Sequence, residues 1–262
     1  MFTAEDHTFV ICAYGDSPFL QDCVSSLLNQ SKKSEVLIST STPSDFIDSI
    51  AKKNGLQVCI NTGKSGIAGD WNAAIACAGT PLVTIAHQDD VYDSNYCARV
   101  ISGANQSEFP LIIFTDYGEI RGGEMVTDSP ILKAKRRLLV PLKSPRLRGC
   151  RVFKRLSLSF GNPICCPSVT YNLNRLQVPL FEEGFRSNLD WGAWERFSRQ
   201  PGAFVYLDFT GMFHRIHGGS ETSGCIQDNV RCSEDLTMLE RFWPKPVAIL
   251  INKVYSMAQA YN

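Results

Sequence analysis

Short apolar runs alternate with amphipathic segments through the first half of the chain. The apolar runs are typical of buried strands and fall at residues 9–13, 35–39, 56–60, 82–86 and 111–115. Between them, apolar residues spaced three or four apart predict helices. Ser17 with Pro18, and Ser44 with Gly55, supply signals for helix starts and a helix end. This alternation predicts an α/β fold with a mixed, mostly parallel sheet and helices on both faces.

The second half of the chain is less regular. Strands are expected around residues 168–172 and 203–207, with a helix between them at residues 191–198. From about residue 235 the tail reads as helical, is interrupted at Trp243-Pro244, and then resumes. The sequence therefore predicts one Rossmann-like α/β domain followed by a C-terminal helical extension.

The composition is that of an ordinary globular protein, with 262 residues of which 44% are apolar and 20% charged. Lysine plus arginine and aspartate plus glutamate both number 26, so net charge gives no reason to expect a nucleic-acid partner. The ten cysteines show no C-x-x-C spacing, which favours free thiols in a reducing cytosol. A signal peptide and an apolar run of about 18 residues are both missing, so a cytoplasmic protein is expected.

A polar motif, HQDD at residues 87–90, directly follows the fourth predicted strand. Ligands of parallel sheets bind beyond the carboxyl ends of the strands, so these side chains are expected to face a ligand crevice. Carboxylate oxygens and an imidazole suit Mg²⁺ or Mn²⁺, which neutralises a diphosphate and helps it to leave. The alternative is a polar turn before the next helix, with Asp93 or Ser94 as N-cap.

Two further motifs contain residues suited to catalysis. HRIHGGS at residues 214–220 holds two of the chain's four histidines. It offers a metal ligand and an arginine for phosphate, or else it is a polar strand end that leads into a mobile loop. NLDW at residues 188–191 opens a helix, where Asp190 is either an N-cap or a general base aimed into the cleft.

Together these motifs resemble those of the family 2 glycosyltransferases, which have the GT-A fold. The resemblance spans roughly residues 8–220 and rests on four segments in the family's order. They are FVICAYGDSPFLQDCVSSLLNQS, NTGKSGIAGDWNAAIACAGTPLVTIAHQDD, FEEGFRSNLDWGAWERFSRQPG and HRIHGGS. One such match would be weak, whereas four in this order are specific.

The resemblance implies inverting transfer of a sugar from a nucleotide-sugar donor to a glycan or lipid-linked acceptor, as in bacterial surface polysaccharide assembly. It implies that Asp190 is the base. It also implies that Mn²⁺ or Mg²⁺ is held by Asp89, with His217 and His87 as further ligands, while Arg215 pairs with the leaving phosphates. The other residues expected to border the nucleotide are Ala13, Tyr14, Asp16, Ser39, Asp70, Asn72 and Gln88.

Two departures from the family pattern affect this expected site. The family's D-x-D motif has an acid where this chain has His87. An acidic pair usually follows the family's second strand and contacts the nucleobase, but this chain reads STST at residues 39–42. The residues that would identify the nucleobase are thus missing from this chain. Uridine, and hence a UDP-sugar, is the default expectation. The rival interpretations are a nucleotidyltransferase and a non-catalytic nucleotide-sugar-binding protein.

The expected organisation is a nucleotide-sugar-binding half at residues 1–118, an acceptor and catalytic half at residues 119–222, and the helical extension at residues 223–262. Within the second half, residues 133–155 hold ten lysines or arginines and no acid. This segment is either a solvated, mobile loop or a basic surface. A basic surface would attract the donor diphosphate, an anionic acceptor or the acidic inner face of a membrane, to which the protein would bind peripherally.

Overall fold

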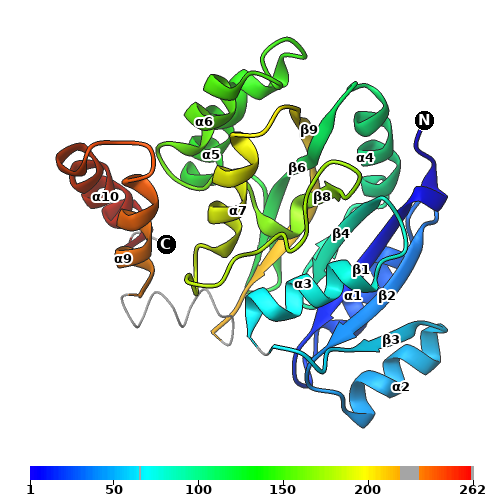
Figure 1. The fold of residues 1–262 in the computed structure, drawn as a ribbon. Coiled ribbons are helices and arrows are strands. Elements are labelled where there is room, and N and C mark those ends of the chain that lie inside the picture. The colour runs from blue at the N-terminus through cyan, green and yellow to red at the C-terminus, as the bar shows by residue number, and fades with distance from the viewer. Residues whose placement is uncertain (65, 219–229, 261–262) are drawn as a thin grey trace.

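The computed structural model describes residues 1–64, 66–218 and 230–260, and a single twisted sheet forms its centre (Figure 1). The order along the sheet is β3-β2-β1-β4-β8-β6-β9-β5, and β7 pairs with β6. The strands are β1 (His7–Ala13), β2 (Glu35–Thr40), β3 (Gln57–Ile60), β4 (Leu82–His87), β5 (Val91–Tyr92), β6 (Pro110–Arg121), β7 (Glu124–Val126), β8 (Val169–Asn172) and β9 (Ala203–Ile216). Antiparallel β8 lies between β4 and β6, so the predicted mixed α/β sheet is confirmed.

Helices cover both faces of this sheet. They are α1 (Leu20–Leu28), α2 (Asp45–Asn54), α3 (Ile67–Cys77), α4 (Tyr96–Asn105), α5 (Pro130–Leu139), α6 (Arg151–Leu158), α7 (Leu189–Ser198), α9 (Val230–Leu239) and α10 (Lys245–Ala260), with short 3₁₀ turns η1 (Ala4–Asp6), η2 (Val140–Lys143) and η3 (Cys166–Ser168). Phe9 and Ile11 of β1 pack in the core under α1, α2 and α4, whereas Val10 packs in the core under α3 and α7. Successive residues of β1 are all apolar because both faces are covered.

The predicted helix signals were right at α2 and wrong at α1. The Ser44 hydroxyl accepts the Ile47 N–H at 3.3 Å, and Gly55 ends α2 with φ of 68°. Helix α1 begins at Leu20 instead of after Ser17, whose hydroxyl accepts the N–H of Phe19. The predicted caps of α4 were wrong as well, because its N-cap is Asn95 and that side chain makes no capping bond.

Strands β6 and β9 are much longer than the sequence predicts. They were expected to end at Thr115 and Leu207, but they run on in parallel, with Glu119 opposite His214, to Arg121 and Ile216. Register shifts interrupt the pairing around residues 115–117. The extension matters for function because it carries the HRIH motif to the end of β4.

The basic segment is largely helical, so its interpretation as a loop was wrong. Helix α5, turn η2 and helix α6 occupy most of residues 133–155. Lys154 is fully buried and donates to the carbonyl oxygens of Gln200 and Gly202 at 2.6 and 2.8 Å. Arg155 pairs with the buried Glu195. Part of the basic charge is therefore neutralised inside the domain.

The tail forms the predicted helical extension, with α9 and α10 separated at Trp243 and Pro244. No helix in the described parts of the chain is long and apolar enough to span a bilayer. The buried Cys23 and Cys97 are free thiols. Gly219, Ser220 and the predicted boundary at residues 222 and 223 lie outside the described residues.

Candidate active site

The HQDD motif turns sharply at the carboxyl end of β4, because the Asp90 N–H donates to the His87 carbonyl at 3.2 Å. This turn separates two neighbouring carboxylates. Asp90 is fully buried, whereas the Asp89 side chain is 17% exposed. The Asp90 Oδ1 atom lies 3.0 Å from His214 Nδ1 and accepts the backbone N–H of Arg215 at 3.0 Å. Asp90 therefore fixes the end of β9 against the end of β4.

The contact between Asp90 and His214 is an ion pair. Burial by itself would lower the pKa of His214, but the Asp90 carboxylate outweighs burial and raises that pKa to about 8. His214 is consequently protonated at neutral pH. Its positive charge is neutralised in place by Asp90.

Asp89 meets the second histidine of the HRIH motif. The Oδ2 atom of Asp89 lies 2.9 Å from His217 Nε2, and Arg215 Nε donates to the Asp89 carbonyl at 2.9 Å. The Arg215 guanidinium lies 4.3 Å from the ring centre of Phe19 and 3.5 Å from Asp22 Oδ2. Phe19 also packs on the His217 ring at 5.3 Å. Phe19 and Asp22, which the start of α1 brings here, were not predicted as site residues.

Asp89 and His217 form a donor set that fits a divalent cation. Burial would raise the pKa of Asp89, but the neighbouring His87 and His214 rings and the hydrogen bond from His217 together lower it. Asp89 is therefore a carboxylate at neutral pH. A partly exposed carboxylate beside an imidazole nitrogen suits Mn²⁺ or Mg²⁺ with its other positions open to water or phosphate.

The structure does not bring His87 together with Asp89 and His217. The described residues hold no group of three or more His, Cys, Asp or Glu side chains arranged for a metal. The His87 ring stacks on Trp71 at 5.3 Å, and its Nδ1 lies 4.0 Å from Asp90 Oδ2. Burial lowers the pKa of His87, so its ring is neutral. At neutral pH His87 therefore brings no positive charge to the turn.

Gln88 joins the ends of β4 and β1. Its Nε2 donates to the Tyr14 carbonyl at 2.9 Å, and its Oε1 accepts the Tyr14 N–H at 3.1 Å. The Tyr14 side chain itself is 67% exposed. Nearby, Asp16 Oδ1 accepts the Ser44 hydroxyl at 2.7 Å, which ties the loop after β1 to the start of α2. Tyr14 and Asp16 thus form an accessible rim, and Gln88 positions it.

Three residues that were expected to border the nucleotide, Ala13, Ser39 and Asn72, make other contacts in the structure. The side chains of Ala13 and Ser39 are buried, 4% and 3% exposed, because both strands are covered at these positions. The Asn72 amide accepts the N–H groups of Leu180 and Phe181 and donates to the Phe181 carbonyl. These side chains therefore support the sheet and the segment before α7, and do not present a surface to a nucleotide.

Asp70 lies in the first turn of α3, where it accepts the Asn61 side-chain amide at 2.8 Å. The preceding Gly69 is required by close packing. A Cβ atom at that position would lie 2.2 Å from the Lys64 carbonyl oxygen. Gly69 therefore lets the loop after β3 pack directly on α3.

Asp190 is the second residue of α7, so its prediction as the N-cap was wrong. The N-cap is Asn188, whose side chain makes no capping bond. Asp190 Oδ1 accepts the Trp191 N–H and Oδ2 accepts the Asn162 side-chain amide, both at 2.7 Å. Burial raises the pKa of Asp190 to about 6, and these two hydrogen bonds offset only part of the rise. Asn162 was not predicted as a site residue.

Asp190 lies within electrostatic range of the HQDD turn. Burial raises the pKa of Cys165, and the carboxylates of Asp90 and Asp190 both add to that rise. Lys135 lowers the pKa of both Asp190 and His214. The fold therefore brings together the three predicted motifs, which are spread over about half of the chain.

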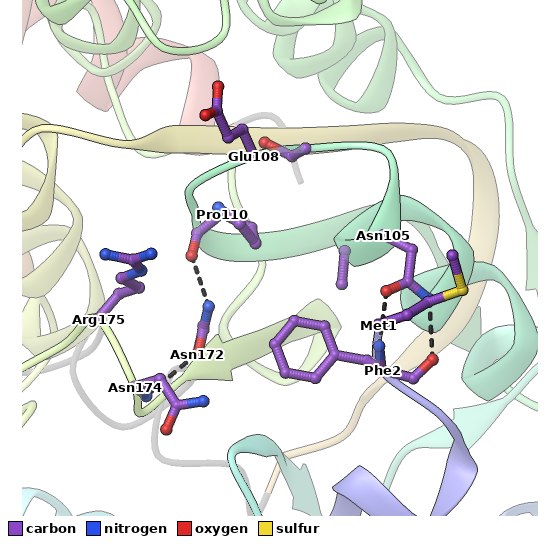
Figure 2. A pocket seen from close by; sticks show the side chains of 10 residues that line it. Met1, Phe2, Asn105, Glu108, Pro110, Asn172, Asn174 and Arg175 are labelled. Atoms are coloured by element: carbon purple, nitrogen blue, oxygen red, sulfur yellow. Dashed lines mark hydrogen bonds between the residues drawn. The ribbon is translucent and has the colours of Figure 1, made fainter.

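A cavity of about 440 Å³ lies elsewhere, and Figure 2 shows its lining. Phe2, Asn105, Pro110 and Asn172 border it, and none of the predicted site residues does. Asn172 is opposite Leu82, the first residue of β4, so the cavity is at the other end of that strand from the HQDD turn. It is not the site that the motifs define.

The mixed sheet therefore carries an acidic turn after β4 and, after β8, the helix α7 with its buried Asp190. Residues 8–158, more than half of the chain, match glycosyl transferase family 2. The chain belongs to this family and is a glycosyltransferase.

Solved structures confirm the fold at low sequence identity. The S. aureus TarS 1-349 structure in complex with UDP-GlcNAc has a TM-score of 0.61 at 16% identity, covering 94% of this chain and 70% of that one. The glucosyl-3-phosphoglycerate synthase of Mycobacterium tuberculosis, solved with Mn²⁺, UDP and glucosyl-3-phosphoglycerate, has a TM-score of 0.60 at 13% identity, covering 90% and 80%. A search of the curated proteins finds no match.

Asp90→Ala should lower the free energy of unfolding by about 2–4 kcal/mol, because it leaves the His214 cation, whose side chain is 23% exposed, without its partner. The ion pair's contribution is complete below the ordinary pKa of 6.5 and is lost as the pH rises through about 8, where His214 deprotonates. Urea denaturation at several pH values measures this difference.

Asp48→Ala on the exposed face of α2 is the control and should change stability by less than about 0.5 kcal/mol. A loss at Asp90→Ala that is equally small, or that does not shrink above pH 8, would contradict the ion pair.

Proposed function

We propose that the chain transfers a sugar, with inversion, from a UDP-sugar to a hydroxyl group of a glycan or lipid-linked acceptor. The observation that carries the proposal is the 2.9 Å contact between Asp89 and His217 in a family 2 glycosyltransferase. The complexes of S. aureus TarS with UDP-GlcNAc and of the M. tuberculosis synthase with Mn²⁺ and UDP support this donor class and cation.

In this proposal, Asp89 and His217 would hold Mn²⁺ or Mg²⁺ beside the diphosphate of the donor. A cation there neutralises the diphosphate and makes it a better leaving group. Arg215 adds a guanidinium beside the same turn, held by the Asp89 carbonyl and by Asp22. Guanidinium groups pair well with phosphate, so Arg215 is placed to bind the departing nucleotide.

Asp190 accepts the proton of the acceptor hydroxyl. The hydroxyl oxygen attacks the anomeric carbon, the bond from that carbon to the diphosphate oxygen breaks, and the nucleoside diphosphate leaves. A pKa of about 6 suits this role, because Asp190 is ionised at neutral pH and is more basic than an ordinary carboxylate. Asn162 and the Trp191 N–H fix both oxygens and so orient the carboxylate.

The donor's nucleoside is proposed to lie along the rim formed by Tyr14 and Asp16, with Asp70 at its border. Residues 1–118 would then serve the donor, residues 119–222 the acceptor and catalysis, and residues 223–262 would be an extension. Surface polysaccharide assembly in the cytoplasm is the proposed setting. Nucleoside diphosphate as the released product would support this reaction, whereas pyrophosphate would indicate a nucleotidyltransferase.

Asp89→Ala should abolish turnover and remove the Mn²⁺-dependent part of UDP binding, because it deletes the one carboxylate of the proposed pair. Calorimetric titration of UDP with and without Mn²⁺ measures the binding. Asp48→Ala should behave like wild type in the same titration. Metal-dependent binding that survives in Asp89→Ala would rule out Asp89 as a ligand.

Asp190→Asn should leave UDP and Mn²⁺ affinity near normal and slow transfer at least about a hundredfold, because the amide cannot accept the proton. Wild-type transfer should fall as the pH drops below about 6, where Asp190 becomes protonated, and the variant should lack this limb. Rates over a pH series measure both effects.

Glu183→Gln is the matched control, since Glu183 is an exposed carboxylate that pairs with Lys64 at 2.7 Å. It should transfer sugar at close to the wild-type rate. If Asp190→Asn did so as well, the base would have to be sought elsewhere, first at Glu182 or Asp208.

A further inference from the structure

Helix α6 exposes an apolar stripe. Val152 and Leu156 are four residues apart and therefore lie on one face of the helix, and Phe160 follows two residues beyond its end. These side chains are 67%, 43% and 41% exposed. The buried residues of the same helix, Lys154 and Leu158, face the domain. The stripe is thus the outer face of a helix whose inner face is already packed.

Helix α10 exposes a second stripe. Val247, Leu250 and Val254 follow a spacing of three and four, and Leu250 is 65% exposed. The opposite side of α10 is packed, because Ala248 is buried and Asn252 donates to the Cys232 carbonyl of α9 at 3.1 Å. This helix therefore presents apolar side chains outward although its packing on α9 is already satisfied.

The two stripes meet at the turn between α9 and α10. The rings of Phe160 and Trp243 are 5.3 Å apart, and Trp243 Nε1 donates to the Ser159 carbonyl at 2.7 Å. Figure 1 shows α9 and α10 on the α6 side of the domain, at the far end from α2 and β3. We use the term α6–α10 surface for Val152, Leu156, Phe160, Trp243, Val247, Leu250 and Val254.

Unneutralised positive charges lie at the start of α6, where Arg151 is next to Val152, and in the basic segment before it. The sequence has no acid between Asp128 and Glu182 and none after Glu240. Arg137, Arg146 and Arg151 are exposed, and no described carboxylate is within ion-pairing distance of any of them. The other cations of the basic segment either pair with a carboxylate or donate hydrogen bonds within the domain, so these three form a separate, exposed set.

We infer that the α6–α10 surface binds the face of a membrane that contains anionic lipids. Apolar helix faces flanked by arginine are suited to lie in the plane of a bilayer interface, with the apolar residues in the acyl boundary and the cations at the headgroups. The basic charge favours an anionic bilayer over a second copy of this equally basic surface. The inference goes beyond the proposed function and does not depend on it.

Flotation of the full chain with phosphatidylcholine vesicles, with and without phosphatidylglycerol, tests the inference. The chain should float only with the anionic vesicles, and less at physiological than at low salt, because exposed charges are screened over about 8–10 Å. Leu156→Glu and Leu250→Glu should each weaken the partition at least about tenfold. Arg146→Glu combined with Arg151→Glu should weaken it too.

Ile60→Glu is the matched control, because Ile60 is 56% exposed on β3, at the opposite edge of the sheet. It should float like wild type, and all variants should keep wild-type donor hydrolysis, which shows that they are folded. Three results would overturn the inference: no flotation with anionic vesicles, equal loss in Ile60→Glu, or wild-type flotation of Leu156→Glu and Leu250→Glu. A chain that dimerises, and becomes monomeric in Leu156→Glu, would instead identify a protein interface.

Discussion

The buried Asp90 carboxylate is the constraint on which the site depends. It has no exposure to water, and it holds His214 and the Arg215 N–H from 124 and 125 residues further along the chain. A charge so deeply buried is tolerable only with such partners, so the ends of β4 and β9 are forced together. The exposed half of the site follows from this. With Asp90 turned inward, Asp89 faces His217, and the Arg215 side chain reaches the carbonyl of Asp89.

The regular part of the fold could be predicted because its strands are apolar on both faces. The missed part was the polar continuation of β6 and β9. The apolar run that predicted this strand ends at Thr115, yet β6 continues through Asp116 and Glu119. Their charges are matched by Arg136 at 3.0 Å and by Arg121 at 2.7 Å. These ion pairs, and the pairing of β6 with β9, depend on tertiary contacts, which hydrophobic periodicity does not encode.

The same limit explains why the site and the basic segment were predicted only in part. Order along the chain indicated that Asp89, His217 and Asp190 belong to one site, but not that Asn72 and Ser39 serve the scaffold. Likewise, a run of cations without acids looks solvated when read alone. In the fold, carboxylates from distant elements neutralise part of it, as Glu195 of α7 does for Arg155 and Asp208 of β9 does for Lys143. The sequence does not reveal which cations are left over.

Asp190 shows how one carboxylate can meet a structural and a chemical requirement together. In the first turn of α7 it accepts the N–H of Trp191, which is the benefit a capping residue gives. Burial works in the opposite direction and raises its pKa to about 6 despite that bond and the one from Asn162. A carboxylate stabilised only by its helix would have a lowered pKa and would be a weak base. The excess of burial over hydrogen bonding is therefore what makes Asp190 suited to proton transfer, and the packing around α7 supplies it.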